Sequence, residues 1–464
     1  MPDPSAKPTK RTFAAPTGTR DLYPLELARR RWIEDKWRKV AVRHGFDEID
    51  GPTFEHTELY TAKSGDGIVG EIFSTFSGKD PDAVKEMGAR LAAGERGAIA
   101  PYALRPEFTP TLARMFAARG GQFPKPCKWF WQGPCYRAER PQRGRLREFW
   151  QWNCDILGSD SAISDAELLA VCIDLLASCG LRPGQVQVRL NDRSIAGIIL
   201  AEVGIPNEQY SQVLDLLDRR SKLSAEEFAW QAGKLGVGRE QVEAVVGYFD
   251  QLATAGFERV MSEMFPGDDT DQIVTDRMYE LSNRLDDAGL AEWWKFDPTI
   301  VRGLAYYTGM VFEVIVDGER AVAGGGRYDN LIETFGGPPT PAVGFGMGDV
   351  VLSLVLQDKG LMPSDKQIAA DLGLRPNAFV ISNGQPESDA AVGPMLAALR
   401  RKGMHARRSY KSTKNVGKLL QDAAASGARY AVIIESATEV TLKDMDANTQ
   451  DKGPASELLA RIKP

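Results

Sequence analysis

The chain lacks several features that would place it in a large class of proteins. None of its apolar runs approaches the roughly 18 residues that a membrane-spanning helix needs. Its five cysteines include no Cys-x-x-Cys pair, so neither a structural zinc site nor a disulfide framework is indicated. It has no Gly-x4-Gly-Lys-[Ser/Thr] phosphate loop, and Gly344-x-Gly346-x-Gly348 has the wrong spacing for a dinucleotide loop. These absences favour a globular protein that we expect to have no membrane partner. The cysteine usage fits a reducing, cytoplasmic environment.

The N-terminus also lacks the apolar core of a signal peptide. Residues 1–16 contain charges and four prolines, so we expect them to form a disordered arm. The 464 residues, 43% of them hydrophobic, are enough for two to four domains with large cores. The formal net charge of −6 argues against a protein coated in nucleic acid and leaves room for local basic patches.

The strongest feature that is present is an Arg-rich segment, residues 136–151, between two aromatic runs. The runs at 128–131 and 149–152 are too aromatic for an exposed edge, so we expect two buried strands joined by a basic turn. Side chains alternate along a strand, which puts Arg137 and Glu139 on one face before the turn. After the turn, the residues that share a face are Arg147, Phe149, Gln151 and Asp155. A solvated charged turn is the ordinary alternative. Guanidinium groups beside an aromatic ring and amide or carboxyl groups suit a substrate with phosphates, a purine and an amino group.

The rest of the chain predicts three further regions. Residues 25–44 have helical periodicity, and a strand with a late proline follows at 46–54. A block of helices is expected at 191–295, before strands resume at 299. Beyond a Pro- and Gly-containing stretch at 361–375, strands and helices alternate, which predicts a small doubly wound domain at 376–464.

A second constellation lies at 301–313 and 324–331. The first stretch contains Arg302, Tyr306 and Tyr307, and the second contains three glycines followed by Arg327 and Tyr328. Taken separately, paired tyrosines are more often core residues and three glycines are more often a turn. Residues 104–109 add a third short pattern, Leu-Arg-Pro-Glu-x-Thr.

Together these stretches resemble the motifs of histidyl-tRNA synthetases, a family of class II aminoacyl-tRNA synthetases, over nearly the whole chain from Gly18 onward. The resemblance implies an α+β catalytic domain with an antiparallel sheet flanked by helices, at 17–190 and 296–360. A helical insertion at 191–295, a linker at 361–375 and a C-terminal α/β anticodon-binding domain at 376–464 would complete the chain. Class I signatures are absent.

The same resemblance implies roles for individual residues. Recognition of an imidazole needs a donor and an acceptor for its two nitrogens. The residues implied for the imidazole are Asp155, Tyr307 and Tyr328 with Tyr306 beside them, and those for the α-amino group are Glu107, Thr109 and Gln151. Arg137 and Arg302 would be catalytic at the α-phosphate of ATP. Phe149 would stack on adenine and Glu139 would read its amino group. Arg145 and Arg147 would contact the β- and γ-phosphates together with Mg²⁺, for which no protein ligand is implied.

Four positions depart from the family pattern, and one of them is Ala305, which replaces a common Asp. Motif 3 usually reads Gly-x-Glu-Arg-Leu, and at 342–352 Val350 and Val351 stand in the Glu-Arg positions. Asp155 stands where many family members have Glu.

The resemblance implies a cytoplasmic, homodimeric histidine–tRNA ligase that forms histidyl adenylate from L-histidine and ATP and transfers histidine to tRNA(His). The runner-up is a non-catalytic histidine sensor, the regulatory subunit of ATP phosphoribosyltransferase, which generally lacks the C-terminal domain. A synthetase-derived RNA-binding or signalling module is a third reading.

A basic stretch between residues 400 and 418 favours a chain with an RNA partner. It holds eight Lys or Arg residues and no Asp or Glu, in a chain that is acidic overall. Segregated positive charge of this kind is typical of a surface that binds a polyanion, although a solvated helix end is the plain alternative. The candidate tRNA contacts are Arg407, Arg408, Lys411 and Lys414.

Overall fold

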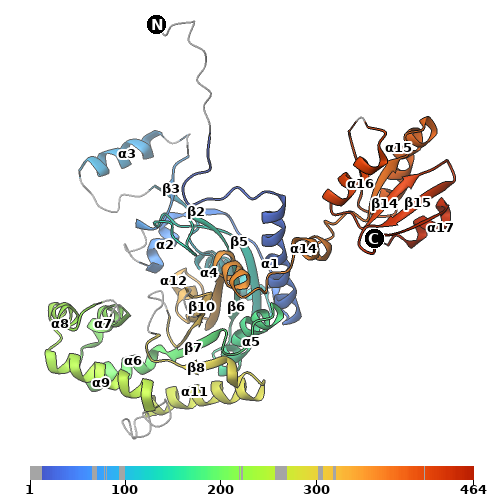
Figure 1. Ribbon diagram of the computed structural model, residues 1–464. Helices are drawn as coiled ribbons and strands as arrows, with labels where there is room; N and C mark the ends of the chain where they lie inside the picture. The colour runs from blue at the N-terminus through green and yellow to red at the C-terminus, as the bar shows by residue number, and fades with distance from the viewer. Residues whose placement is uncertain are drawn as a thin grey trace, which may run out of the picture. The chain divides into compact units, whose positions relative to one another are not determined.

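The computed structural model describes residues 13–64, 70–77, 79, 81–93, 100–218, 220, 223–255, 269–300, 307–316, 320–411 and 413–463. The chain divides into two compact units (Figure 1). The first contains Met1–Asp21 and Ile33–Met362, and the second contains Leu22–Trp32 and Pro363–Pro464. Within the described part, no helix combines the length and the hydropathy that a membrane crossing needs.

The first unit is built on an eight-stranded sheet in the order β1-β5-β6-β11-β10-β9-β7-β8. The strands are β1 (Asp47–Glu48), β5 (Cys127–Tyr136), β6 (Glu148–Leu157), β7 (Gln187–Asp192), β8 (Trp294–Phe296), β9 (Met310–Ile315), β10 (Ala323–Arg327) and β11 (Ala342–Gly348). The two outermost pairs are parallel and the other pairs are antiparallel. Strand β6 therefore lies beside β11, although the two are far apart in sequence. The expected antiparallel sheet flanked by helices is present.

Helices cover the sheet and bury its aromatic strands. Helix α5 (Ala162–Ser178) begins at Ser161, whose side chain accepts a hydrogen bond from the backbone N–H of Ile163. The other helices that cover the two faces of the sheet are α1 (Pro24–Arg43), α4 (Thr109–Arg119), α12 (Leu331–Thr334) and α13 (Asp349–Asp358). Just before α4, the Phe108 ring stacks on Trp131 of β5 with centroids 4.2 Å apart. Burial of such large rings is the main stabilising contribution of this core.

A second, three-stranded sheet precedes the main hairpin in sequence. It has the order β2 (Phe54–His56), β4 (Tyr102–Leu104) and β3 (Ser74–Thr75), with α2 (Thr57–Ser64) and α3 (Pro81–Ala92) beside it. The single strand expected at 46–54 is instead split into β1 and β2. Pro52 lies at the break, because proline has no N–H for a ladder and disfavours the interior of a strand.

The helical insertion follows β7. Its helices are α6 (Arg193–Glu202), α7 (Tyr210–Asp218), α8 (Ala225–Lys234), α9 (Arg239–Ala255) and α11 (Asp269–Asp287). Asp192 starts α6 by accepting from the Ser194 N–H at 2.8 Å, and Ser224 caps α8 in the same way. Figure 1 shows these helices in green and yellow beside the β7–β8 edge. The helix positions agree with those expected from periodicity.

The second unit carries a five-stranded sheet in the order β13-β12-β14-β15-β16. Its elements are α14 (Asp365–Asp371), β12 (Ala378–Ser382), α15 (Pro386–Arg401), β13 (Ala406–Arg408), α16 (Val416–Ala425), β14 (Tyr430–Ile434), β15 (Glu439–Asp444), β16 (Thr449–Pro454) and α17 (Ala455–Leu458). Separate apolar clusters lie on its two faces, as expected for an α/β domain.

The stretch at 361–375, which we expected to be a linker, contains the helix α14. Its side chains are tied to the first half of α1, which belongs to the same unit. Arg29 donates to both carboxylate oxygens of Asp365, at 2.9 and 3.0 Å, and the Trp32 indole donates to Asp371 at 3.1 Å. These contacts join residues more than three hundred positions apart, which is why local sequence patterns do not reveal them.

Candidate active site

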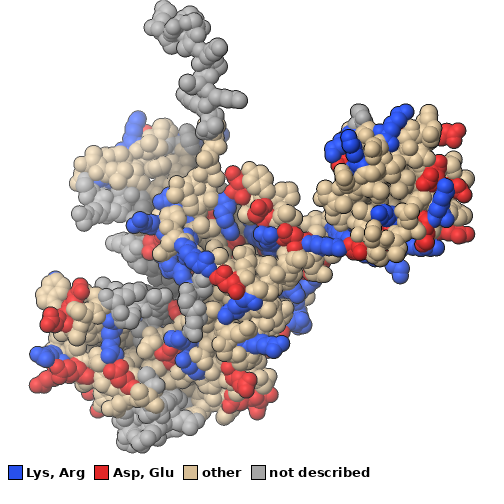
Figure 2. Space-filling model, viewed as in Figure 1, with Lys and Arg blue, Asp and Glu red and all other residues tan. Residues whose placement is uncertain are grey.

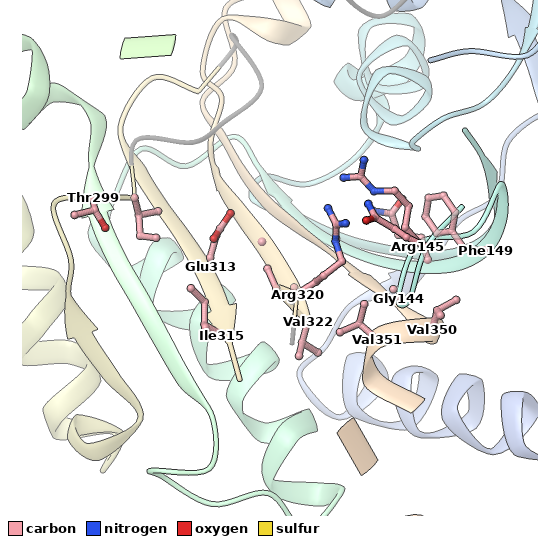
Figure 3. Close-up of a pocket in the computed structure, with 18 of the residues that line it drawn as sticks. Gly144, Arg145, Phe149, Thr299, Glu313, Ile315, Arg320, Val322, Val350 and Val351 are labelled. Atoms are coloured by element: carbon pink, nitrogen blue, oxygen red, sulfur yellow. The ribbon is translucent and has the colours of Figure 1, made fainter. Parts of the chain in front are cut away.

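A cavity of about 1270 Å³ opens in the first unit beside the β5–β6 turn (Figure 3). Its walls come from β6, the ends of β9 and β10, the start of α13 and two helices of the insertion. The lining residues on which the argument depends are Arg137, Gly144, Arg145, Phe149, Gln151, Arg220, Glu313, Arg320, Val350 and Val351. Guanidinium groups, two aromatic rings and two carboxamides therefore line one space.

The β5–β6 hairpin places the first group of candidate residues. Its register pairs Cys135 with Phe149 and Gly133 with Gln151, so Phe149 and Gln151 share a face, as predicted from alternation. At the tip, Gln142 and Arg145 exchange two backbone hydrogen bonds of 3.0 and 2.9 Å. This turn fixes the positions from which the basic side chains reach the cavity.

Arg137 lies directly against Phe149. Its guanidinium carbon is 5.3 Å from the centroid of the Phe149 ring, and its Nε donates to the backbone carbonyl of Pro106 at 3.1 Å. Both residues line the cavity. A cation fixed at the edge of an aromatic ring provides neighbouring places for a phosphate and a stacked base.

The other charged residues of the turn are held by partners. Arg145 forms an ion pair with Glu139 and lines the cavity. The Arg147 guanidinium donates to the Glu139 carbonyl at 3.2 Å and to the Thr17 carbonyl at 3.5 Å. Arg147 is not among the residues that line the cavity. The Arg137 N–H donates to the Arg147 carbonyl at 2.9 Å, so the hairpin pairing continues to residue 147, one position before β6 begins.

A buried polar pair lies further along β6. The Tyr328 hydroxyl donates to Asp155 Oδ1 at 2.5 Å, and both side chains are about 1% exposed. Burial, followed by the nearby Asp155 charge, raises the pKa of Tyr328 well above its ordinary value, so the hydroxyl keeps its proton. The Tyr307 ring is close by, 3.2 Å from where a Cβ on Gly326 would stand. Arg302 and Tyr306, two further candidates, lie outside the described residues.

Two glycines of β11 give these β6 side chains their room. Gly344 pairs with Asp155, and a Cβ at position 344 would overlap Asp155 Oδ1. A Cβ at Gly346 would likewise overlap the Gln151 amide. The glycine spacing at 344–346 therefore makes space beside the neighbouring strand and forms no nucleotide loop.

The candidates for the α-amino group lie behind Gln151. The Cys135 thiol donates to Gln151 Oε1 at 3.2 Å, and burial raises the pKa of Cys135 to about 12, so the thiol remains a donor. The charge of Glu107 also acts on this thiol. Glu107 and Thr109, the first residue of α4, are both buried. Gln151 also lines the cavity, so it joins the buried Cys135 to that space.

Sequence reasoning missed four charged residues of the cavity wall. Glu313 of β9 and Arg320, ahead of β10, line the cavity, as do Arg220 and Asp250 of the insertion, which pair with each other at 3.2 Å. Among the residues that the structure describes, no group of three or more His, Cys, Asp or Glu side chains is placed to hold a metal ion.

The known proteins that resemble the chain fit this arrangement. The family model described as histidyl-tRNA synthetase matches residues 100–348. The chain belongs to the histidyl-tRNA synthetase family. A histidine–tRNA ligase of Haloarcula marismortui is 35% identical over 95% of both chains, and one of Opitutus terrae is 35% identical over 97% of this chain and 98% of its own.

Solved structures show the same fold. A Nostoc histidyl-tRNA synthetase superposes with a TM-score of 0.74 at 21% identity, covering 97% of this chain and all of its own. A Bacillus halodurans protein described as an ATP phosphoribosyltransferase regulatory subunit/histidyl-tRNA synthetase has a TM-score of 0.69 at 20% identity, with 92% of this chain and 99% of its own covered.

Within this family, the motif 3 segment of the chain has an unusual chemistry. Asp349, the first residue of α13, accepts hydrogen bonds from Arg20 at 2.9 Å and from the Trp150 backbone N–H at 2.8 Å. Val350 and Val351 follow it in the first turn and line the cavity with apolar groups. The side chains at the Glu-Arg positions of the family pattern therefore offer no charge to a ligand.

The basic stretch of the second unit is exposed and only partly neutralised. Arg407 and Arg408 lie on the edge strand β13, and the Arg408 guanidinium is 5.8 Å from the ring centroid of Tyr410, which is 89% exposed. Lys411 pairs with Asp422 at 2.5 Å, while Lys414 lies exposed ahead of α16. Figure 2 shows basic and acidic side chains interspersed on the visible face of this unit.

Proposed function

We propose that the chain is an active histidine–tRNA ligase, which uses ATP to convert L-histidine into histidyl adenylate and then transfers histidine to tRNA(His). The observation that carries the proposal is the continuity of two sites at Gln151. On one side lies the cavity with Arg137 and Phe149, and on the other lies the buried Asp155–Tyr328 pair. Family membership over the full length of the chain supports the same reaction.

Histidine would bind at the buried end. The Asp155 carboxylate would offer an acceptor and the Tyr307 hydroxyl a donor to the two imidazole nitrogens, while Tyr328, whose proton goes to Asp155, would hold that carboxylate in place. The protonated α-amino group would meet the Gln151 carboxamide and the Glu107 carboxylate, with Thr109 next to them. This arrangement directs the histidine carboxylate toward the cavity.

ATP would bind in the cavity. Adenine would stack on Phe149, with Glu139 reading its amino group, and Arg137 would contact the α-phosphate. Arg302 would share that role by resemblance. The histidine carboxylate oxygen attacks the α-phosphorus in line and pyrophosphate leaves, so the residues act by positioning and charge neutralisation. Arg145 would face the β- and γ-phosphates. The contacts of Arg147 with Glu139 and Thr17 favour a role in holding the turn.

Mg²⁺ would enter with ATP. This ion keeps several waters and is usually held by one or two carboxylates together with substrate phosphates. Glu313 supplies such a carboxylate in the cavity wall. The bound ion would neutralise phosphate charge, while Glu313 would orient it.

Three further properties belong to the proposal. The tRNA would meet the second unit through Arg407, Arg408 and Lys414, with Tyr410 exposed for base stacking, whereas Lys411 is already paired. A homodimer is favoured by the motif 1-like segment, in which Phe54 of β2 is 56% exposed. A cytoplasmic location is supported by the five cysteines, all of them free and buried.

The alternative is a histidine-sensing regulatory subunit without catalysis. The apolar Val351 favours that reading. The C-terminal unit and the full-length match to ligases favour the enzyme. Histidine-dependent ATP/pyrophosphate exchange on the purified protein separates the two. Exchange is expected, and binding of histidine without exchange at any ATP or Mg²⁺ concentration would instead identify a sensor.

A further inference from the structure

The cavity needs a cation near the first turn of α13. In the family pattern the second residue of the Glu-Arg pair is an arginine, and here Val351 lines the cavity at that place. A triphosphate site with an apolar wall there would leave negative charge without a counter-charge, which is costly away from bulk water. Another side chain must reach the same space if the cavity binds ATP.

Arg320 is the side chain that reaches it. A Cβ placed on Gly144 would lie 3.3 Å from Val351 Cγ2, 3.4 Å from Arg320 Cδ and 3.8 Å from Arg320 Cγ. Val351 and the Arg320 stem therefore lie side by side above Gly144 of the β5–β6 turn. Figure 3 shows Arg320 extending into the cavity on the side of Arg145, with Val351 behind it.

The sheet register explains how residues so far apart in sequence meet. In the β10–β11 ladder, Ala323 pairs with Met347 and Gly324 with Gly346. Strand β11 ends at Gly348 and α13 begins at Asp349, so this pairing brings the start of β10 close to the first turn of α13. Arg320, just ahead of β10, therefore lies beside that turn.

The other cations of the cavity wall have assigned places. Arg137 lies on Phe149, Arg145 pairs with Glu139, and Arg220 pairs with Asp250 of the insertion. Arg320 comes from a third direction, the β9–β10 connection. Its stem lies against Gly144, so it lines the cavity next to Arg145 on the motif 2 turn, where a phosphate chain could contact both guanidinium groups.

We propose that Arg320 supplies the ATP phosphate contact that Val351 cannot provide. The inference rests on the proposed ligase function. Arg320 acts as a catalytic residue in the strict sense, since its guanidinium contacts the polyphosphate during adenylate formation.

The test compares four variants of the full-length protein in histidine-dependent pyrophosphate exchange, with ATP and histidine titrated separately. Arg320→Ala should raise the ATP KM or reduce the exchange rate by roughly 10- to 100-fold, the scale of losing one transition-state donor. The histidine KM and the melting temperature should stay near wild type. Arg239→Ala, which removes an exposed arginine paired within α9, is the control for charge loss and should behave as wild type.

The rescue distinguishes ligand contact from a structural role. Adding Val351→Arg to Arg320→Ala restores an arginine at the family position and should recover at least a tenth of wild-type exchange. Val351→Arg alone shows that the first turn of α13 accepts the side chain. Wild-type ATP kinetics in Arg320→Ala, an equal loss for ATP and histidine, or a double variant no better than Arg320→Ala would each overturn the assignment. Absence of exchange in the wild type would refute the ligase itself.

Discussion

The Tyr328 hydroxyl provides the most direct test of the histidine pocket. Replacing Tyr328 with Phe removes one oxygen and leaves the ring in its buried cluster, so no large cavity forms. The variant loses the 2.5 Å hydrogen bond to Asp155. A hydrogen bond to a charged group contributes about 1.5–3 kcal/mol. At 1.4 kcal/mol per factor of ten, the histidine KM should rise roughly 10- to 150-fold.

The assay is pyrophosphate exchange with histidine varied at saturating ATP, together with calorimetric titration of histidine alone. Both should show the same loss, because the raised pKa of Tyr328 keeps it a donor at every working pH. The ATP KM should change little, since Tyr328 does not line the ATP cavity. Tyr210→Phe, in the helical insertion, is the matched control. A histidine KM within about twofold of wild type in Tyr328→Phe would refute the assignment of Tyr328 and Asp155 to the histidine pocket.

Three other predictions concern separate parts of the molecule. Arg137→Ala should reduce adenylate formation by roughly 100-fold while histidine binding suffers less, and unchanged exchange would remove Arg137 from the α-phosphate. Replacing Arg407, Arg408 and Lys414 with Gln should flatten the salt dependence of tRNA binding by about one unit of slope per lost contact, whereas Lys411→Gln should change it less because Asp422 already pairs with Lys411. An unchanged slope would mean that this surface does not face the tRNA. His44 lies 3.6 Å from Glu167 and hydrogen-bonds Asp174 at 2.9 Å, and these two carboxylates raise its pKa above 6.5, so its stabilising contribution is complete below that pH and is lost as the pH rises through the raised value. The difference in melting temperature between wild type and His44→Gln should therefore shrink as the pH rises above 6.5, and a constant difference would contradict the ion-pair explanation.

The sequence predicted the elements whose information is local. Alternation placed Phe149 and Gln151 on one face of a buried strand, and helical periodicity located the insertion helices. Alternation could not foresee where the long Arg147 side chain ends, because its guanidinium is held by the backbone carbonyls of Glu139 and Thr17. Arg320 was not found because nothing near it in sequence marks it. Its place depends on the pairing of β10 with β11, which only the folded sheet reveals.

Whether an arginine of the β5–β6 turn reaches the cavity also depends on ion-pair and hydrogen-bond partners that are distant in sequence. The Arg-rich turn reads as one uniform basic segment, yet Arg143 pairs with Asp358, which lies beyond motif 3. Arg147 is held by the carbonyl of Thr17. Composition alone could not separate the arginines that face a ligand from those that fasten the turn.

The absence of side chains at Gly344 and Gly346 of β11 restricts how this pocket can change over evolution. Asp155 and Gln151 occupy space that Gly344 and Gly346 leave, so the dimensions of the amino-acid site are set jointly by two strands. A longer acidic side chain at 155 would need the same vacancy, and a methyl group at 344 would have to be matched by a shorter neighbour. Residues 155 and 344 are therefore constrained as a couple, as are 151 and 346, and a shift of amino-acid preference in a descendant requires simultaneous replacement of both members.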